Sequence, residues 1–214
     1  MRQIALPLSA ASDSPPRIVV GNANAGVVDA LLAPCQWPFH TAILTGPPRS
    51  GKSLLARWFA ESGAGDAIDD AQDMDEAELF HRWNRAQESG RPLLIVADRR
   101  FAPGSGEAVG EGMRWRVALP DLSSRLGAAL DLEIGEPDDV MLADLIEIHA
   151  EMRGLALDHA ATQYLAGRST RSHLGVENLV AAIDRLSLER KQAPTMAIWR
   201  DALIESKGGG HTDA

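Results

Sequence analysis

The chain has little of what disulfide-bonded, membrane-spanning or nucleic-acid-binding proteins need. It has a single cysteine, Cys35, among 214 residues, so it can form no internal disulfide. No apolar run approaches the roughly 18 residues of a membrane span, and the apolar N-terminus, broken by Pro7, is too short for a signal peptide. No run of lysine and arginine exceeds two residues, and the net charge of −9 disfavours binding to a phosphate backbone. We therefore expect a cytoplasmic protein without membrane contact or direct DNA binding.

The composition is that of a globular protein, with 45% hydrophobic and 24% charged residues. Its length suits one α/β domain and a smaller helical piece. The expected divisions are 1–16 (an apolar peptide and a Ser/Pro-rich linker), 17–136 (α/β), 137–206 (helices) and 207–214 (a disordered tail).

Hydrophobic periodicity predicts the order of elements. Strands are expected near 18–20, 41–45, 66–70, 92–97 and 130–134, and helices near 25–32, 52–61, 75–89 and 122–126. The pattern then becomes helical only, near 138–153, 159–166, 176–191 and 195–204. The glycine-rich segment 99–114 is expected to be a mobile loop.

A phosphate-binding motif lies between the strand at 41–45 and the helix that follows it. Its glycines let backbone N–H groups converge on phosphate oxygens, Lys52 supplies positive charge and Ser53 offers a hydroxyl to Mg²⁺. The helix N-terminus adds a further positive end. The alternative is a glycine-rich turn without a ligand. The predicted nucleotide-binding residues here are Gly46, Pro47, Pro48, Arg49, Ser50, Gly51, Lys52, Ser53 and Leu54.

Two adjacent acids follow the weak strand at 66–70. Asp69 is predicted to hold Mg²⁺ together with Ser53, and Asp70 to orient or activate water. The alternative is a plain N-cap of the helix that follows.

With these motifs the chain resembles the AAA+ ATPases and, within them, the Hda family of DnaA-related regulators. The resemblance covers about residues 3–205. It is carried by residues 3–8, the phosphate motif with Asp69-Asp70, Val96-Ala97-Asp98-Arg99, and the string 119–126, Leu-Pro-Asp-Leu-Ser-Ser-Arg-Leu. The family fold implies α/β architecture: a P-loop AAA+ parallel sheet of strand order 5-1-4-3-2, followed by a small helical lid.

The resemblance also implies roles for particular residues. Residues Gln3, Ile4, Leu6, Pro7 and Leu8 resemble a peptide that binds the DNA polymerase sliding clamp. Asp98 takes the sensor-1 position at the nucleotide, and Arg125 takes that of an arginine finger. The alternatives are an N-terminal strand on the protein's own sheet, a strand cap for Asp98, and a surface arginine in a salt bridge for Arg125.

Two features depart from the family pattern. Only residues 54–68 lie between Ser53 and Asp69, where relatives place a strand and a helix, so edge strand 2 is expected to be missing. Alignment on the lid helix places Glu177 at the sensor-2 position, with Arg171 upstream. A glutamate near phosphates is repulsive, which predicts weak or no ATPase activity in the chain itself.

The resemblance implies a negative regulator of chromosomal replication initiation. Such a protein binds ATP or ADP with Mg²⁺, docks on the sliding clamp and promotes ATP hydrolysis by DnaA through Arg125 in trans; self-association into a homo-oligomer is compatible with this. The rival interpretations are a self-sufficient AAA+ ATPase or helicase loader, and a DnaA-like DNA-binding protein.

Overall fold

The computed structural model describes residues 2–5, 17–101 and 115–208. Most of the expected loop at 99–114, residues 6–16 and residues 209–214 lie outside this description. The chain divides into two compact units. One comprises residues 5–18 and 24–135, and the other comprises residues 1–4, 19–23 and 136–214. Each unit is described below on its own.

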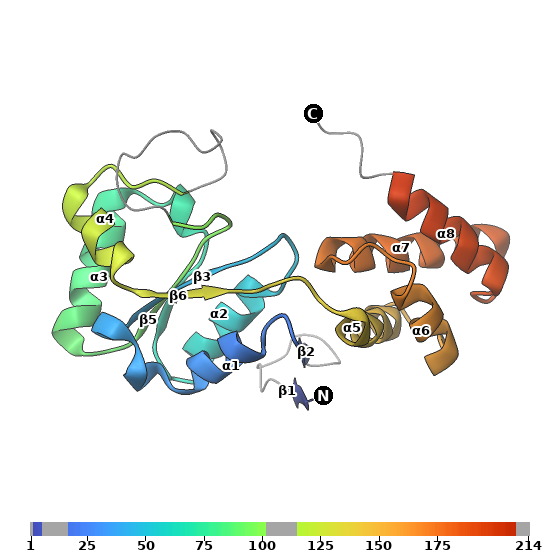
Figure 1. The fold of residues 1–214 in the computed structure, drawn as a ribbon, viewed down its shortest axis with the longest axis horizontal. Helices are drawn as coiled ribbons and strands as arrows, with labels where there is room; N and C mark the ends of the chain where they lie inside the picture. The colour runs from blue at the N-terminus through green and yellow to red at the C-terminus, as the bar shows by residue number, and fades with distance from the viewer. Residues whose placement is uncertain (1, 6–16, 102–114, 209–214) are drawn as a thin grey trace. The chain divides into compact units, whose positions relative to one another are not determined.

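The first unit is built around a four-stranded parallel sheet of order β4-β5-β3-β6 (Figure 1). The strands are β3 (Thr41–Thr45), β4 (Asp66–Ile68), β5 (Leu93–Val96) and β6 (Leu130–Glu133). β3 and β5 are buried along their whole length, which explains the continuous apolar sequence of β5 and the apolar centre of β3 between Thr41 and Thr45. The order is that of the expected AAA+ sheet without its second strand, so β4 is an edge. The predicted fold class is confirmed.

Helices cover both faces of this sheet, with α1 and α2 on one side and α3 and α4 on the other (Figure 1). They are α1 (Ala25–Leu32), α2 (Lys52–Glu61), α3 (Glu76–Ser89) and α4 (Pro120–Gly127), with short 3-10 turns η1 (Pro34–Gln36), η2 (Pro38–His40) and η3 (Ala71–Asp73). Alternate side chains of a strand point to the same face of the sheet. On one face, Ile43 of β3 and Ile95 of β5 pack with Leu79, Leu122 and Leu126 in one core cluster.

The second unit contains four helices around their own apolar core. They are α5 (Asp139–Met152), α6 (His159–Ala166), α7 (His173–Arg190) and α8 (Met196–Gly208). Leu142 and Ile146 pack with Val176, Ile183 and Ile198. α7 begins earlier than expected because the Ser172 side chain caps it, and α8 continues past the expected end at 204.

The N-terminal segment forms a strand. β1 (Arg2–Ala5) and β2 (Arg17–Val20) make a two-stranded sheet separate from the four-stranded one. Beyond β2, the Asn22 side chain donates to the carbonyl of Glu136 (3.1 Å) and accepts from the N–H of Asp138 (2.9 Å). These bonds fix the start of α5, whose first turn Asp138 caps.

None of the helices in the described part of the chain combines the length and apolar character required to cross a bilayer.

Candidate nucleotide-binding site

The loop between β3 and α2 has the backbone geometry of a phosphate cradle. A β-carbon on Gly46 would lie 2.9 Å from Cβ of Ile134 and 3.2 Å from Oγ of Ser50, so only glycine fits there without displacement. Gly51 precedes α2 with φ +90°, a left-handed conformation that glycine adopts without a steric penalty. These two glycines allow the loop to turn tightly into the N-terminus of α2.

Lys52 is held inside this loop. Its side chain is 8% exposed, and Nζ donates to the carbonyl oxygens of Gly46 (3.0 Å) and Pro47 (3.2 Å). Nζ also lies 3.1 Å from Oδ1 of Asp98, whose side chain is 62% exposed. A triphosphate would offer the ammonium group stronger, charged acceptors than these two carbonyls. Lys52 is therefore placed where a phosphate could replace these carbonyls, and its ammonium group is paired with Asp98 in this structure.

Two serines of the motif differ in their surroundings. Ser53, in the first turn of α2, is exposed, so its hydroxyl is accessible to a metal ion. Ser50 is buried, and its Oγ has no hydrogen-bond partner in the described residues. A buried hydroxyl without a partner costs free energy, which a bound phosphate oxygen could recover. Both observations fit the predicted ligand.

Three acids follow the carboxyl ends of β4 and β5. Asp69 and Asp70 follow β4, and Asp98 lies just beyond β5. All three therefore lie at the carboxyl ends of the parallel strands, where β3 also leads into the phosphate loop. The Asp98 N–H donates to Oε1 of Gln72 (3.1 Å), which ties the end of β5 to η3.

Asp70 occupies the N-cap position of η3 without a side-chain capping bond, and neither acid after β4 caps α3. Asp75 does so, accepting from the N–H groups of Ala77 and Glu78 at 3.0 and 3.1 Å. Oδ1 of Asp69 accepts the N–H of Asp70, which has φ +51° in the left-handed region. Both carboxylates are exposed. They retain acceptor capacity for a cation or a water molecule.

The hydroxyl of Ser53 and the carboxylates of Asp69 and Asp70 are oxygen ligands of the kind that Mg²⁺ prefers. No group of three or more His, Cys, Asp or Glu side chains with metal-binding geometry exists within residues 2–5, 17–101 and 115–208. Mg²⁺ is commonly held by one or two carboxylates together with waters and substrate phosphates, so it needs no such cage. Ser53 and Asp69 could serve as the protein ligands, and Asp70 could position water.

A hollow of about 410 Å³ adjoins Asp98. It is lined by Gln72, Asp73, Asp98, Arg99, Trp115 and Arg116. Arg99 and Arg116 bring positive charge next to the carboxylate that contacts Lys52. Arg99 follows Asp98 in the chain, whereas Arg116 lies beside this hollow only because the chain folds, so no signal in the sequence pointed to Arg116.

Arg125 lies in a pocket formed by α3. Its guanidinium carbon is 4.5 Å from the ring centroids of both Phe80 and Trp83, and Nη1 donates to Oδ1 of Asn84. The side chain is half-buried. Arg125 therefore packs against its own domain, through two cation–π contacts rather than the salt bridge considered above, and its role as a finger stays a prediction.

The other predicted residues lie in the second unit or at the N-terminus. Arg171 forms an ion pair with Asp139 (2.8 Å), so it is engaged within the second unit. Glu177 is half-buried in the first turns of α7. It counteracts, in part, the lowering of the His149 pKa that burial causes. Gln3 and Ile4 belong to β1, and the remaining clamp-peptide residues Leu6, Pro7 and Leu8 lie outside the described residues.

The sheet order, the phosphate loop after β3 and the helical unit after β6 define a DnaA-like AAA+ fold. No family model matches the chain. Domain III of the replication initiation protein DnaA from Thermotoga maritima aligns with a TM-score of 0.66 at 15% identity, covering 88% of this chain and 94% of that one. AMPPCP-bound DnaA from Aquifex aeolicus aligns at 0.56 and 18% identity, covering 81% and 66%. The Holliday junction branch migration motor RuvB of T. maritima aligns at 0.55 and 18%, covering 86% and 68%.

Proposed function

We propose that the chain binds ATP or ADP with Mg²⁺ and acts as a cytoplasmic negative regulator of replication initiation. The observation that carries the nucleotide part is Lys52, enclosed in a glycine loop that a β-carbon at Gly46 would obstruct. The similarity of the fold to DnaA domain III, and the AMPPCP bound to the Aquifex DnaA, support this choice of ligand.

The chain's own ATP hydrolysis is proposed to be weak. Asp98 offsets the charge of Lys52, and Glu177 stands at the position from which an arginine would contact phosphates in the resembled family. A carboxylate at either position would reduce the positive charge available to a γ-phosphate, whose transfer depends on charge stabilisation.

Regulation is proposed to occur in trans. Residues 3–8 would dock on the sliding clamp, and Arg125 would contact the nucleotide bound to a neighbouring DnaA molecule. Among the described residues the guanidinium of Arg125 donates a hydrogen bond only to Asn84, so its other N–H groups could donate to a phosphate. Docking would require β1 to exchange its pairing with β2 for contacts with the clamp.

The experiment measures phosphate release from ATP-loaded DnaA in the presence of clamp loaded on DNA. Wild type should accelerate release, while deletion of residues 1–8 should remove both clamp binding and acceleration. Arg125→Ala should bind clamp normally yet fail to accelerate. Full acceleration by the Ala variant would show that Arg125 has only its packing role on α3.

A self-sufficient AAA+ ATPase or helicase loader is the second candidate. The carboxylates of Asp69 and Asp70 favour it, because they are exposed, do not cap α3, and are the kind of group that a hydrolytic site needs to bind a metal ion and water. Rapid turnover of ATP by the chain alone, without DnaA or clamp, would establish this function instead.

A further inference from the structure

The outer edge of β4 has no strand beside it in the described part of the chain. On its inner side, Asp66 donates its N–H to the carbonyl of Pro92 (2.8 Å), and Ile68 stands in register with Ile95 of β5. Hydrogen bonds of a parallel strand alternate between its two sides. The N–H and carbonyl of Ala67 therefore point away from β5, toward the edge.

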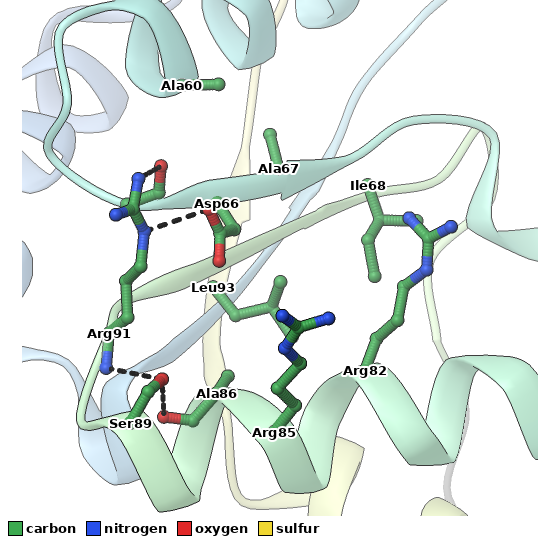
Figure 2. Close-up of a pocket in the computed structure, with 11 residues that line it drawn as sticks. Ala60, Asp66, Ala67, Ile68, Arg82, Arg85, Ala86, Ser89, Arg91 and Leu93 are labelled. Carbon is green, nitrogen blue, oxygen red and sulfur yellow. Dashed lines mark hydrogen bonds and ion pairs between the residues drawn. The ribbon is translucent and has the colours of Figure 1, made fainter.

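A groove of about 640 Å³ runs along this edge between α2 and α3 (Figure 2). Figure 2 shows Ala60 on the α2 side of the strand and the side chains of Arg82 and Arg85 extending from α3 toward it. The groove is lined by the small side chains of Ala60 on α2, Ala67 on β4 and Ala86 on α3, which leave room for another chain.

The groove is positively charged on a protein whose net charge is −9. Arg91 pairs with Asp66 (2.9 Å) and Arg82 pairs with Glu78 (2.9 Å), but Arg85 has no ion pair or hydrogen bond within the described residues.

We propose that this groove binds an acidic segment of a partner protein in extended conformation. The segment adds to β4 as a further strand, pairs its backbone with Ala67 and places alternate carboxylates on Arg82 and Arg85. An exposed strand edge recognises the backbone of another chain, and side-chain pockets beside it give selectivity. A small anion would use the arginines but not the strand edge, and a neutral strand would leave Arg85 unpaired.

A direct test uses fluorescence anisotropy with the full chain and a labelled synthetic peptide that alternates glutamate and valine. Saturable binding is expected. Arg85→Glu should weaken it at least about tenfold, since charge reversal replaces attraction by repulsion. Arg200→Glu on α8, which removes an exposed arginine of the other unit, should leave it unchanged. The same peptide N-methylated at alternate residues should also lose about tenfold, because it cannot pair as a strand.

Several results would overturn the proposal. Equal affinity for the N-methylated peptide would show attraction by charge alone, and full displacement by inorganic phosphate would show an anion site. Self-association that Arg85→Glu abolishes, measured by sedimentation, would identify a second copy of this chain as the occupant. The affinity for ATP should be the same in wild type and Arg85→Glu, so failure here is separable from failure of the nucleotide site.

Discussion

Asp98→Asn should strengthen nucleotide binding, because Asp98 forms an ion pair with Lys52. Bound phosphates either separate Asp98 from Lys52 or come to lie beside its carboxylate. In the first case the ion pair is lost, and in the second the like charges repel. Removing the carboxylate charge should therefore tighten nucleotide binding in both cases.

The magnitude follows from the exposure of the pair. Asp98 is 62% exposed, so water screens the interaction and its strength is that of a surface pair, at most about 1 kcal/mol. This corresponds to an affinity gain of roughly fivefold at most. The gain should shrink as salt is added, because screening already weakens the pair in wild type.

The assay is calorimetric titration with AMPPCP, which separates binding from hydrolysis. Asp73→Asn provides a matched control, because Asp73 lines the same hollow and contacts Gln72 but not Lys52. Its affinity should equal that of wild type. Unchanged or weaker binding by Asp98→Asn, or an equal gain in the control, would refute the reasoning.

Three further predictions concern stability and the loop. Arg125→Ala should lower the free energy of unfolding by about 1–3 kcal/mol through loss of two cation–π contacts and a hydrogen bond, and Arg125→Met by less; denaturant titration measures both. Burial lowers the pKa of His149, so the unfolded chain binds more protons and stability should fall as pH drops through about 6.5; thermal melts of His149→Gln should show a smaller fall. Gly46→Ala should weaken ADP binding while the chain stays folded by circular dichroism, because the methyl group meets Ile134; unchanged affinity would contradict the cradle geometry.

Local signals in the sequence predicted most of the fold. The buried strand β5 is a continuous apolar run, β3 has an apolar centre, and α1 and α6 begin and end where periodicity places them. The short interval between Ser53 and Asp69, set against the pattern of the resembled family, predicted the missing edge strand, and the order β4-β5-β3-β6 agrees with it. These features depend on neighbours in the chain, so a sequence can carry them.

Contacts between distant residues could not be predicted in the same way. The packing of Arg125 against Phe80 and Trp83, and the bond to Asn84, join segments about forty residues apart. The pairing of Lys52 with Asp98 depends on β3 and β5 being neighbours in the sheet. The sequence also allowed Asp69 or Asp70 to cap the following helix, but the residue whose side chain caps α3 is Asp75.

Calorimetric titration of ATP with Mg²⁺ into wild type and Lys52→Ala tests the central claim most directly. Lys52 is the one charged side chain enclosed by the carbonyls of the phosphate loop in the described residues. Wild type should bind with a single-site isotherm, and the alanine variant should show no measurable binding while unfolding at a similar denaturant concentration. Equal affinity in the two proteins would contradict the assignment of this loop as the nucleotide site.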